Sequence, residues 1–183
     1  MDWLAEVSEK ARRNNQVLFA KDSEYLADLA DLIRHQNRRT LALWAFELSE
    51  ESVMRLEDAC PAEARPREAL EAARAWAAGD IKMPLARRKI LDCHAVAKEL
   101  ANPEAIALCH AVGQACSVVH TVGHALGYPL YDLTATVHRH GLNACGDAVE
   151  ERKQHYIDRL LHWSACVHDY PGPWARFMLD SQL

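Results

Sequence analysis

Residues 105–131 read AIALCHAVGQACSVVHTVGHALGYPLY and contain no Asp, Glu, Lys or Arg, in a chain of which 26% is charged. The stretch is long enough to span a lipid bilayer. However, three histidines and a glutamine are rarely tolerated on a helix that faces lipid. We therefore predict a central helix over about residues 103–126, surrounded by other helices of a soluble protein, with no membrane partner.

Short breaker sequences divide the rest of the chain into further helices. Asn102, Pro103 and Glu104 supply a cap, a proline suited to the first helical position and an acid that faces the helix dipole. Gly79 is a natural stop for a helix that begins near Pro66. After a short amphipathic helix and a loop in the first 22 residues, we expect helices at about 23–37, 40–59, 66–78, 85–101, 103–126, 130–140 and 144–168.

No segment shows the alternating pattern of a strand, and the chain has only seven glycines and seven prolines. These features favour an all-α fold. We expect one helical domain over residues 1–183, a bundle of about six to eight helices with a tail at 169–183. Trp174 and Phe177 in this tail are expected to pack back on the body.

Composition excludes several classes of function. The net charge of −5 and the pI of about 6.0 provide no basic surface for nucleic acid. The six cysteines form no CxxC pair, so the usual zinc knuckle and redox motifs are missing, and no cofactor is expected. The N-terminal residues do not resemble a signal peptide, which favours the cytoplasm and reduced thiols.

Histidines supply the main candidates for chemistry. Cys116, His120 and His124 are spaced i, i+4 and i+8, so a continuous helix would place them on one face and make them the best metal ligands available. The set is incomplete, because Thr121 stands where the zincin pattern has Glu. The favoured interpretation is that these histidines are partly buried and bonded to neighbouring polar groups, with no metal.

Arg87 and His94 lie seven residues apart on the helix predicted at 85–101. His94 would meet His120 or His124 across a helix interface, and Arg87 would supply an anion-binding group there. The favoured alternative pairs Arg87 with an acidic residue of a neighbouring helix. Arg65 is expected to lie in solvent at the start of the helix predicted near residue 66, or to dock on the C-terminus of another helix. Trp76 is expected to be a core residue.

Two surfaces are further candidates for contacts with a partner. The helix at 40–59 carries an acidic side, formed by Glu47, Glu50, Glu51, Glu57 and Asp58, which is usual for solubility but also suits a basic partner. On the central helix, small residues would allow close approach of a second copy of the chain: Cys109, Gly113, Cys116 and Ser117.

Several segments resemble immunity proteins of bacterial polymorphic toxin systems, most of all the all-helical immunity-protein-five-like group. The resemblance covers roughly residues 36–140. It is carried by an R-P-x-x-A…W-x-x-G run and an H-x-x-x-H-A segment, with Arg87 and His94 matching the helix between them. The matching residues of the two motifs are Arg65, Pro66, Ala69, Trp76, Gly79, His120, His124 and Ala125. Gln114 departs from the pattern, since relatives often carry a His there.

The resemblance implies a protein that neutralises a toxin by binding it, with no chemistry of its own. The binding residues implied by the matched motifs are Arg65, Trp76, Arg87, His94, His120 and His124. Two alternatives remain open. One is a metal- or small-ligand-binding protein or enzyme that uses His94, His120 and His124, and the other is an oligomerising helical module, such as a homodimer.

Overall fold

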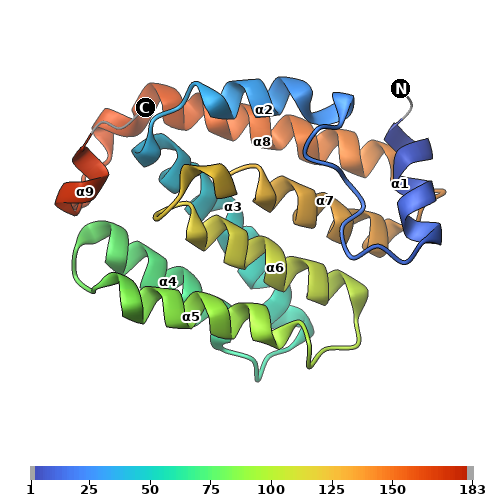
Figure 1. The fold of residues 1–183 in the computed structure, drawn as a ribbon, viewed down its shortest axis with the longest axis horizontal. Coiled ribbons are helices and arrows are strands. Elements are labelled where there is room, and N and C mark those ends of the chain that lie inside the picture. Colours follow the sequence, from blue (N-terminus) through green and yellow to red (C-terminus); the bar gives the residue numbers. More distant parts are fainter. Residues whose placement is uncertain (1–2, 181–183) are drawn as a thin grey trace.

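The computed structural model describes residues 3–180, and within them the chain is all-α, with 74% of the residues in helices and no strand (Figure 1). Short 3₁₀ turns η1 (Glu24–Leu26), η2 (Val122–His124) and η3 (Val167–Asp169) connect some of the helices. No helix of this part has the length and apolarity needed to cross a membrane. The helices are α1 (Trp3–Arg12), α2 (Ala27–Arg34), α3 (Arg38–Ala59), α4 (Arg65–Ala78), α5 (Met83–Val96), α6 (Pro103–Ser117), α7 (Gly127–His140), α8 (Gly146–Cys166) and α9 (Arg176–Leu179).

Local chemistry accounts for the ends of the main helices. The Asn37 side chain accepts a hydrogen bond from the Thr40 amide at 3.0 Å and caps α3, and Asn102 does the same for the Glu104 amide at 2.9 Å in α6. Gly79 closes α4 with a φ of 92°, in the left-handed region. The predicted roles of Asn102 and Gly79 are confirmed.

Two helical hairpins and one long helix organise the bundle (Figure 1). Helices α4 and α5 run in opposite directions, as do α6 and α7, and each pair is packed together. Helix α8 lies on the other side of the bundle with α2 along it. Helix α3 contacts α4, α6 and α8, so it links the two halves of the molecule.

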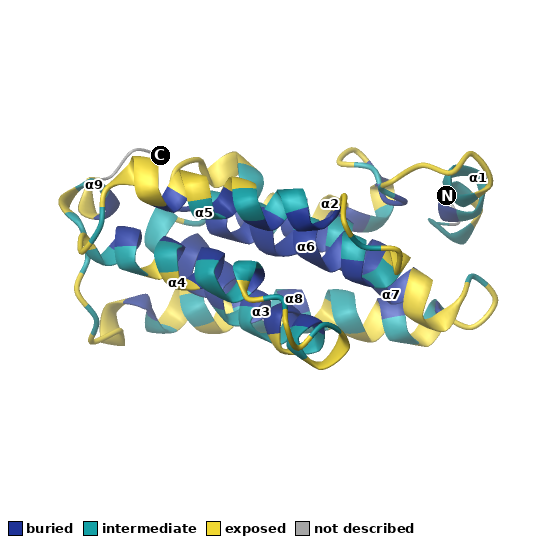
Figure 2. Ribbon diagram, turned by 90° about the horizontal axis from the view of Figure 1, so that it is seen from below, coloured by how far each residue is buried: buried dark blue, intermediate teal, exposed yellow. Residues whose placement is uncertain are grey.

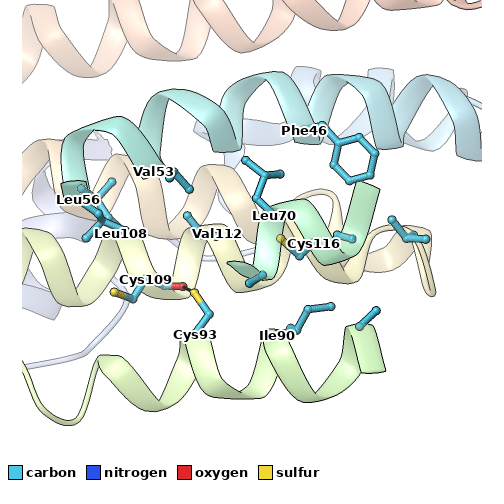
Figure 3. Close-up of a cluster of buried hydrophobic side chains, with 14 of the residues drawn as sticks. Phe46, Val53, Leu56, Leu70, Ile90, Cys93, Leu108, Cys109, Val112 and Cys116 are labelled. Atoms are coloured by element: carbon cyan, nitrogen blue, oxygen red, sulfur yellow. Dashed lines mark hydrogen bonds between the residues drawn. The ribbon is translucent and has the colours of Figure 1, made fainter. Parts of the chain in front are cut away.

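Helix α6 is buried from two sides, as its lack of charge predicted. Leu108 and Val112 enter a hydrophobic cluster with α3, α4 and α5 (Figure 3). Ala111 and Ala115 enter a second cluster with α7, α8 and the N-terminal helices. Figure 2 shows the resulting buried band along α6. The central position of this helix is therefore confirmed.

The predicted end of this helix is wrong. Helix α6 ends at Ser117 instead of about Leu126. Val118, Val119 and Thr121 are β-branched and weak helix formers, and the backbone amides of His120 and Thr121 both bond to the Ser117 carbonyl in a turn. The chain then reverses through η2, and α7 starts at Gly127 instead of about residue 130.

The small residues of α6 are used inside the chain. Cys109, Gly113 and Cys116 are buried. The Cys93 thiol of α5 donates to the Cys109 carbonyl at 3.4 Å (Figure 3). A Cβ atom added to Gly113 would lie 2.3 Å from His94 Nε2. Because α5 covers this face, it is not exposed to a second copy of the chain.

Asp132 of α7 is a fully buried carboxylate that joins three helices. Arg152 Nε and the Tyr156 hydroxyl of α8 each donate to its Oδ2 at 2.6 Å. Ser52 and Arg55 of α3 donate to its Oδ1 at 3.3 and 3.4 Å. Burial alone would raise the pKa of Asp132, but the charges of Arg152 and Arg55 outweigh it and hold the pKa below its usual range.

We expect Asp132→Ala to lower the free energy of unfolding by about 3–5 kcal/mol, because it removes the buried acceptor of four hydrogen bonds and leaves Arg152 with only the partly exposed Glu51 as a counter-charge. Urea denaturation followed by circular dichroism measures the change. Asp58→Ala, at an exposed site, is the control and should stay within about 0.5 kcal/mol of wild type. If the two variants had equal free energies of unfolding, the hydrogen bonds and ion pairs of Asp132 would not stabilise the fold as proposed.

We expect acid to remove the contribution of Asp132 to the free energy of unfolding. Its pKa is lower in the folded chain than the value of about 3.9 expected when unfolded, so the carboxylate stabilises the fold above that value. The stabilisation is lost as pH falls through the folded pKa. The difference in unfolding free energy between wild type and Asp132→Asn should therefore shrink below about pH 4. A difference that widens in acid would contradict the direction of the shift.

Candidate functional site

A cavity of about 500 Å³ opens between α5, the end of α4 and the segment that follows α6. We call it the histidine pocket. None of the described residues that line it is acidic. Its lining residues are Trp76, Met83, Arg87, Ile90, Leu91, His94, Ser117, His120 and His124.

Helix α5 supplies one wall of the pocket. Met83, Arg87 and Leu91 recur every four residues, and His94 follows three residues later, so they share one flank of the helix. Ile90 lies between this flank and the buried face and is 6% exposed. Leu91, at the outer edge, is 55% exposed. The exposure of the side chains in this wall therefore increases from the core toward the solvent.

The early end of α6 forms the opposite side. Ser117 donates its hydroxyl to the Gly113 carbonyl at 2.8 Å, and the chain then leaves the helix. The turn that follows carries His120 and His124 toward α5. These two histidines meet at the pocket because the helix has stopped, and not because they share a helical face.

The predicted grouping of Cys116 with His120 and His124 is wrong for the same reason. Cys116 is in the last turn of α6, fully buried in the core, and burial raises the pKa of its thiol to about 12. Within residues 3–180, no three His, Cys, Asp or Glu side chains are grouped so as to hold a metal ion.

A chain of hydrogen bonds orients His94. The Gln16 amide nitrogen lies 2.7 Å from His110 Nε2, and His110 Nδ1 lies 3.0 Å from His94 Nδ1. Because the Gln16 amide donates, His110 Nε2 accepts, and the His110 proton is on Nδ1. His110 therefore donates to His94 Nδ1, which leaves the His94 proton on Nε2.

His94 is neutral at physiological pH. Burial lowers the pKa of His94 to about 4, and the neighbouring His110 and His124 act in the same direction. Burial also lowers the pKa of His110. Within residues 3–180, His94 Nε2–H has no hydrogen-bond partner, so His94 offers the pocket a neutral, unused donor.

Gln114 holds the second histidine. Its Oε1 accepts a hydrogen bond from His124 Nδ1 at 2.8 Å, so His124 keeps an acceptor lone pair on Nε2. Gly127 makes room for this arrangement, since a Cβ there would lie 2.4 Å from Gln114 Oε1. Burial lowers the pKa of His124, with smaller contributions from Lys21 and His120.

Trp76 forms an aromatic side of the pocket. Its ring centroid is 5.9 Å from that of His120 and 5.6 Å from that of Phe177 in the C-terminal tail. The Ala175 amide anchors this tail by donating to the Ala77 carbonyl at 2.7 Å. The predicted return of the tail to the body is thus confirmed.

Arg87 is exposed and is the only guanidinium in the pocket lining of the described chain. Among residues 3–180 it forms no ion pair and no hydrogen bond. The predicted pairing of Arg87 with an acidic residue of a neighbouring helix is therefore wrong for this part of the chain. A positive charge is left available at the pocket.

Five of the six predicted binding residues converge on the pocket, and Arg65 does not. Arg65 Nη2 lies 2.6 Å from both Glu63 and Glu99, so it ties the start of α4 to the loop after α5. Arg65 is therefore not simply solvated at the entrance of the helix, since two carboxylates hold it there. The use of Trp76, Arg87, His94, His120 and His124 in binding stays a prediction.

Sequence reasoning missed the residues that orient the histidines and line the outer wall. The spacing of Met83 and Leu91 could have indicated their place in this wall, because each lies four residues from Arg87 on the same helix. His110 and Gln114 also lie four residues apart. Gln16 had none, since it lies in an irregular segment and reaches His110 only in the folded chain.

The close approach at Gly113 gives a test of the site geometry. Gly→Ala inside a helix ordinarily stabilises by about 1 kcal/mol. We expect Gly113→Ala to destabilise by about 1–3 kcal/mol instead, because the added methyl overlaps the His94 ring. Urea denaturation provides the measurement. Gly123→Ala is the control, since a Cβ there meets only Thr121 Cγ2 at 3.8 Å, and a stabilised Gly113→Ala would contradict the packing described.

The chain is similar to known proteins at the level of a family. A family model described as Imm-5 like putative immunity protein matches residues 31–161. This range contains every residue that lines the histidine pocket. No curated protein and no solved structure matches the chain.

Proposed function

The chain belongs to the family of Imm-5 like putative immunity proteins, and on that basis we propose that it binds and neutralises a cognate toxin domain without chemistry of its own. Family membership supports an immunity-type function and implies a protein partner. The surface we assign to that partner is the mouth of the histidine pocket together with the exposed flank of α5.

Exposed apolar side chains support this choice of surface. Met83, Leu91 and Val122 are 39%, 55% and 38% exposed, and they lie on α5 or on the turn beside the pocket. Grouped apolar exposure of this kind is typical of protein contact sites. Arg87 adds a positive charge in the same place, with no counter-charge from the described part of the chain. Protein interfaces commonly combine such arginines with apolar anchors.

The acidic side of α3 is a weaker candidate. Glu47 pairs with Arg159 at 2.9 Å, Glu50 with Arg74 at 2.9 Å, and Glu51 with Arg152. These carboxylates are already neutralised by residues of the same chain. A basic partner would have to displace those arginines, which leaves little net attraction.

A small-ligand site is the second candidate, because the cavity has the volume of such sites, about 300–1,000 Å³, and gathers several polar groups. The walls argue for a protein instead. Leu91 and Arg87 line the cavity but remain exposed, so a small ligand would leave them in contact with solvent.

Co-expression tests the proposal. Each neighbouring reading frame of the source genome is expressed alone and together with this protein, and host growth is scored. We expect one neighbour to stop growth and this protein to restore it by binding. If a toxic neighbour is found and no complex forms with it, toxin neutralisation by binding is excluded for that pair.

A matched pair of variants tests the surface. Leu91→Glu should weaken binding of the toxin about tenfold or more, because it places a charge in an apolar contact. Leu161→Glu on α8 is the control, since Leu161 is 50% exposed and should leave affinity unchanged. The free energy of unfolding of both variants should lie within about 0.5 kcal/mol of the wild-type value. If only Leu161→Glu lowered the affinity, the interface would lie on α8 and the assignment to α5 would be wrong.

A further inference from the structure

We propose that the histidine pocket is a carboxylate-binding site that receives an acidic side chain of the toxin domain, with Arg87 and His94 Nε2–H as the donors. The inference rests on the proposed function, which supplies the partner. It goes beyond it by naming the chemical group that enters the pocket and the two side chains that bind it.

Charge is the first reason. Most arginines of the described chain are held by acids, as Arg152 is by Asp132 and Arg65 is by Glu99. Arg87 has no such partner within residues 3–180, although it borders a cavity. Arg38, Arg39, Arg88 and Arg176 also have no acidic partner within residues 3–180, but none of them lines this cavity. Since no acidic side chain lines this cavity in the described residues, a carboxylate from outside would be the first negative charge beside Arg87.

Hydrogen-bond direction is the second reason. The Gln16–His110–His94 chain leaves His94 with its proton on Nε2 and without a partner in residues 3–180. A neutral N–H in a half-buried position suits an anionic oxygen. The low pKa of His94 means that this donor is present without a positive charge of its own.

The remaining groups favour a carboxylate on a peptide over inorganic phosphate. His124 Nε2 carries a lone pair, which repels an additional anionic oxygen but accepts a peptide N–H. Trp76 and Ile90 are 7% and 6% exposed and form an apolar wall. A carboxylate attached to an apolar group therefore fits the pocket: the carboxylate meets the Arg87 cation and the His94 donor, and the apolar group meets this wall. The His124 acceptor remains for a peptide N–H.

The experiment uses the full chain with ¹⁵N-labelled histidine and needs no toxin. The probe is 3-phenylpropionate, with 3-phenylpropanamide as its uncharged counterpart and inorganic phosphate as the second anion. We expect 3-phenylpropionate to shift the His94 ring signals in a saturable manner with a Kd of about 1 mM. The amide and phosphate should bind at least about tenfold more weakly.

Variants assign the charge. Arg87→Gln should weaken 3-phenylpropionate binding about tenfold, as expected for loss of one charge-assisted hydrogen bond. Arg88→Gln is the matched control, because Arg88 is the next residue, is also exposed and does not line the pocket. Equal losses in the two variants would mean nonspecific attraction and would overturn the assignment to Arg87.

Two further results would overturn the proposal. One is a ¹H–¹⁵N spectrum of the free protein in which His94 carries its proton on Nδ1. The other is the absence of any saturable shift with 3-phenylpropionate at concentrations up to about 10 mM. Because no toxin is present, failure here is distinct from failure of growth rescue. Rescue without carboxylate binding would remove this inference and leave the immunity function in place.

Discussion

The rest of the structure depends on the enclosure of α6. A helix covered from opposite sides by α5 and α7 has little access to water, so an unpaired charge anywhere along it would carry a large desolvation cost. Its small side chains also allow α5 to approach closely, and at Gly113 the His94 ring occupies the space that a Cβ would need. The same contact that packs the core therefore positions a pocket residue.

Charge is handled in two different ways in this molecule. At the junction of α3, α7 and α8, the buried carboxylate of Asp132 is surrounded by four donors, so each helix is tied to the others. Replacing a whole buried network by apolar packing is often neutral for stability, whereas removal of one member is costly because its partners stay buried. At the histidine pocket the reverse holds, because Arg87 is left without a partner in residues 3–180. That contrast distinguishes a structural cluster from a site that is available to a ligand.

Hydrogen bonds fix the orientation of two histidines of the pocket, His94 and His124. Gln114 orients His124, and His110 orients His94, whereas no carboxylate is bonded to either ring within the described chain. A histidine that works as a general base usually has its other ring nitrogen held by such an acid, and a pKa near neutrality. Burial lowers the pKa of both His94 and His124 instead. Directional hydrogen bonds and a fixed tautomer fit the binding role that we propose for the pocket.

The sequence by itself determined the helical class, the cap at Asn102, the stop at Gly79 and the burial of α6, because these follow from local backbone preferences and from the exclusion of charge. It also singled out five of the residues that line the pocket. Only the tertiary structure decided that α6 ends at Ser117, since weak helix formers permit a turn but do not require one. Only the fold placed Gln16 on His110 and left Arg87 without a partner among residues 3–180, because contacts between distant segments depend on how whole helices are packed.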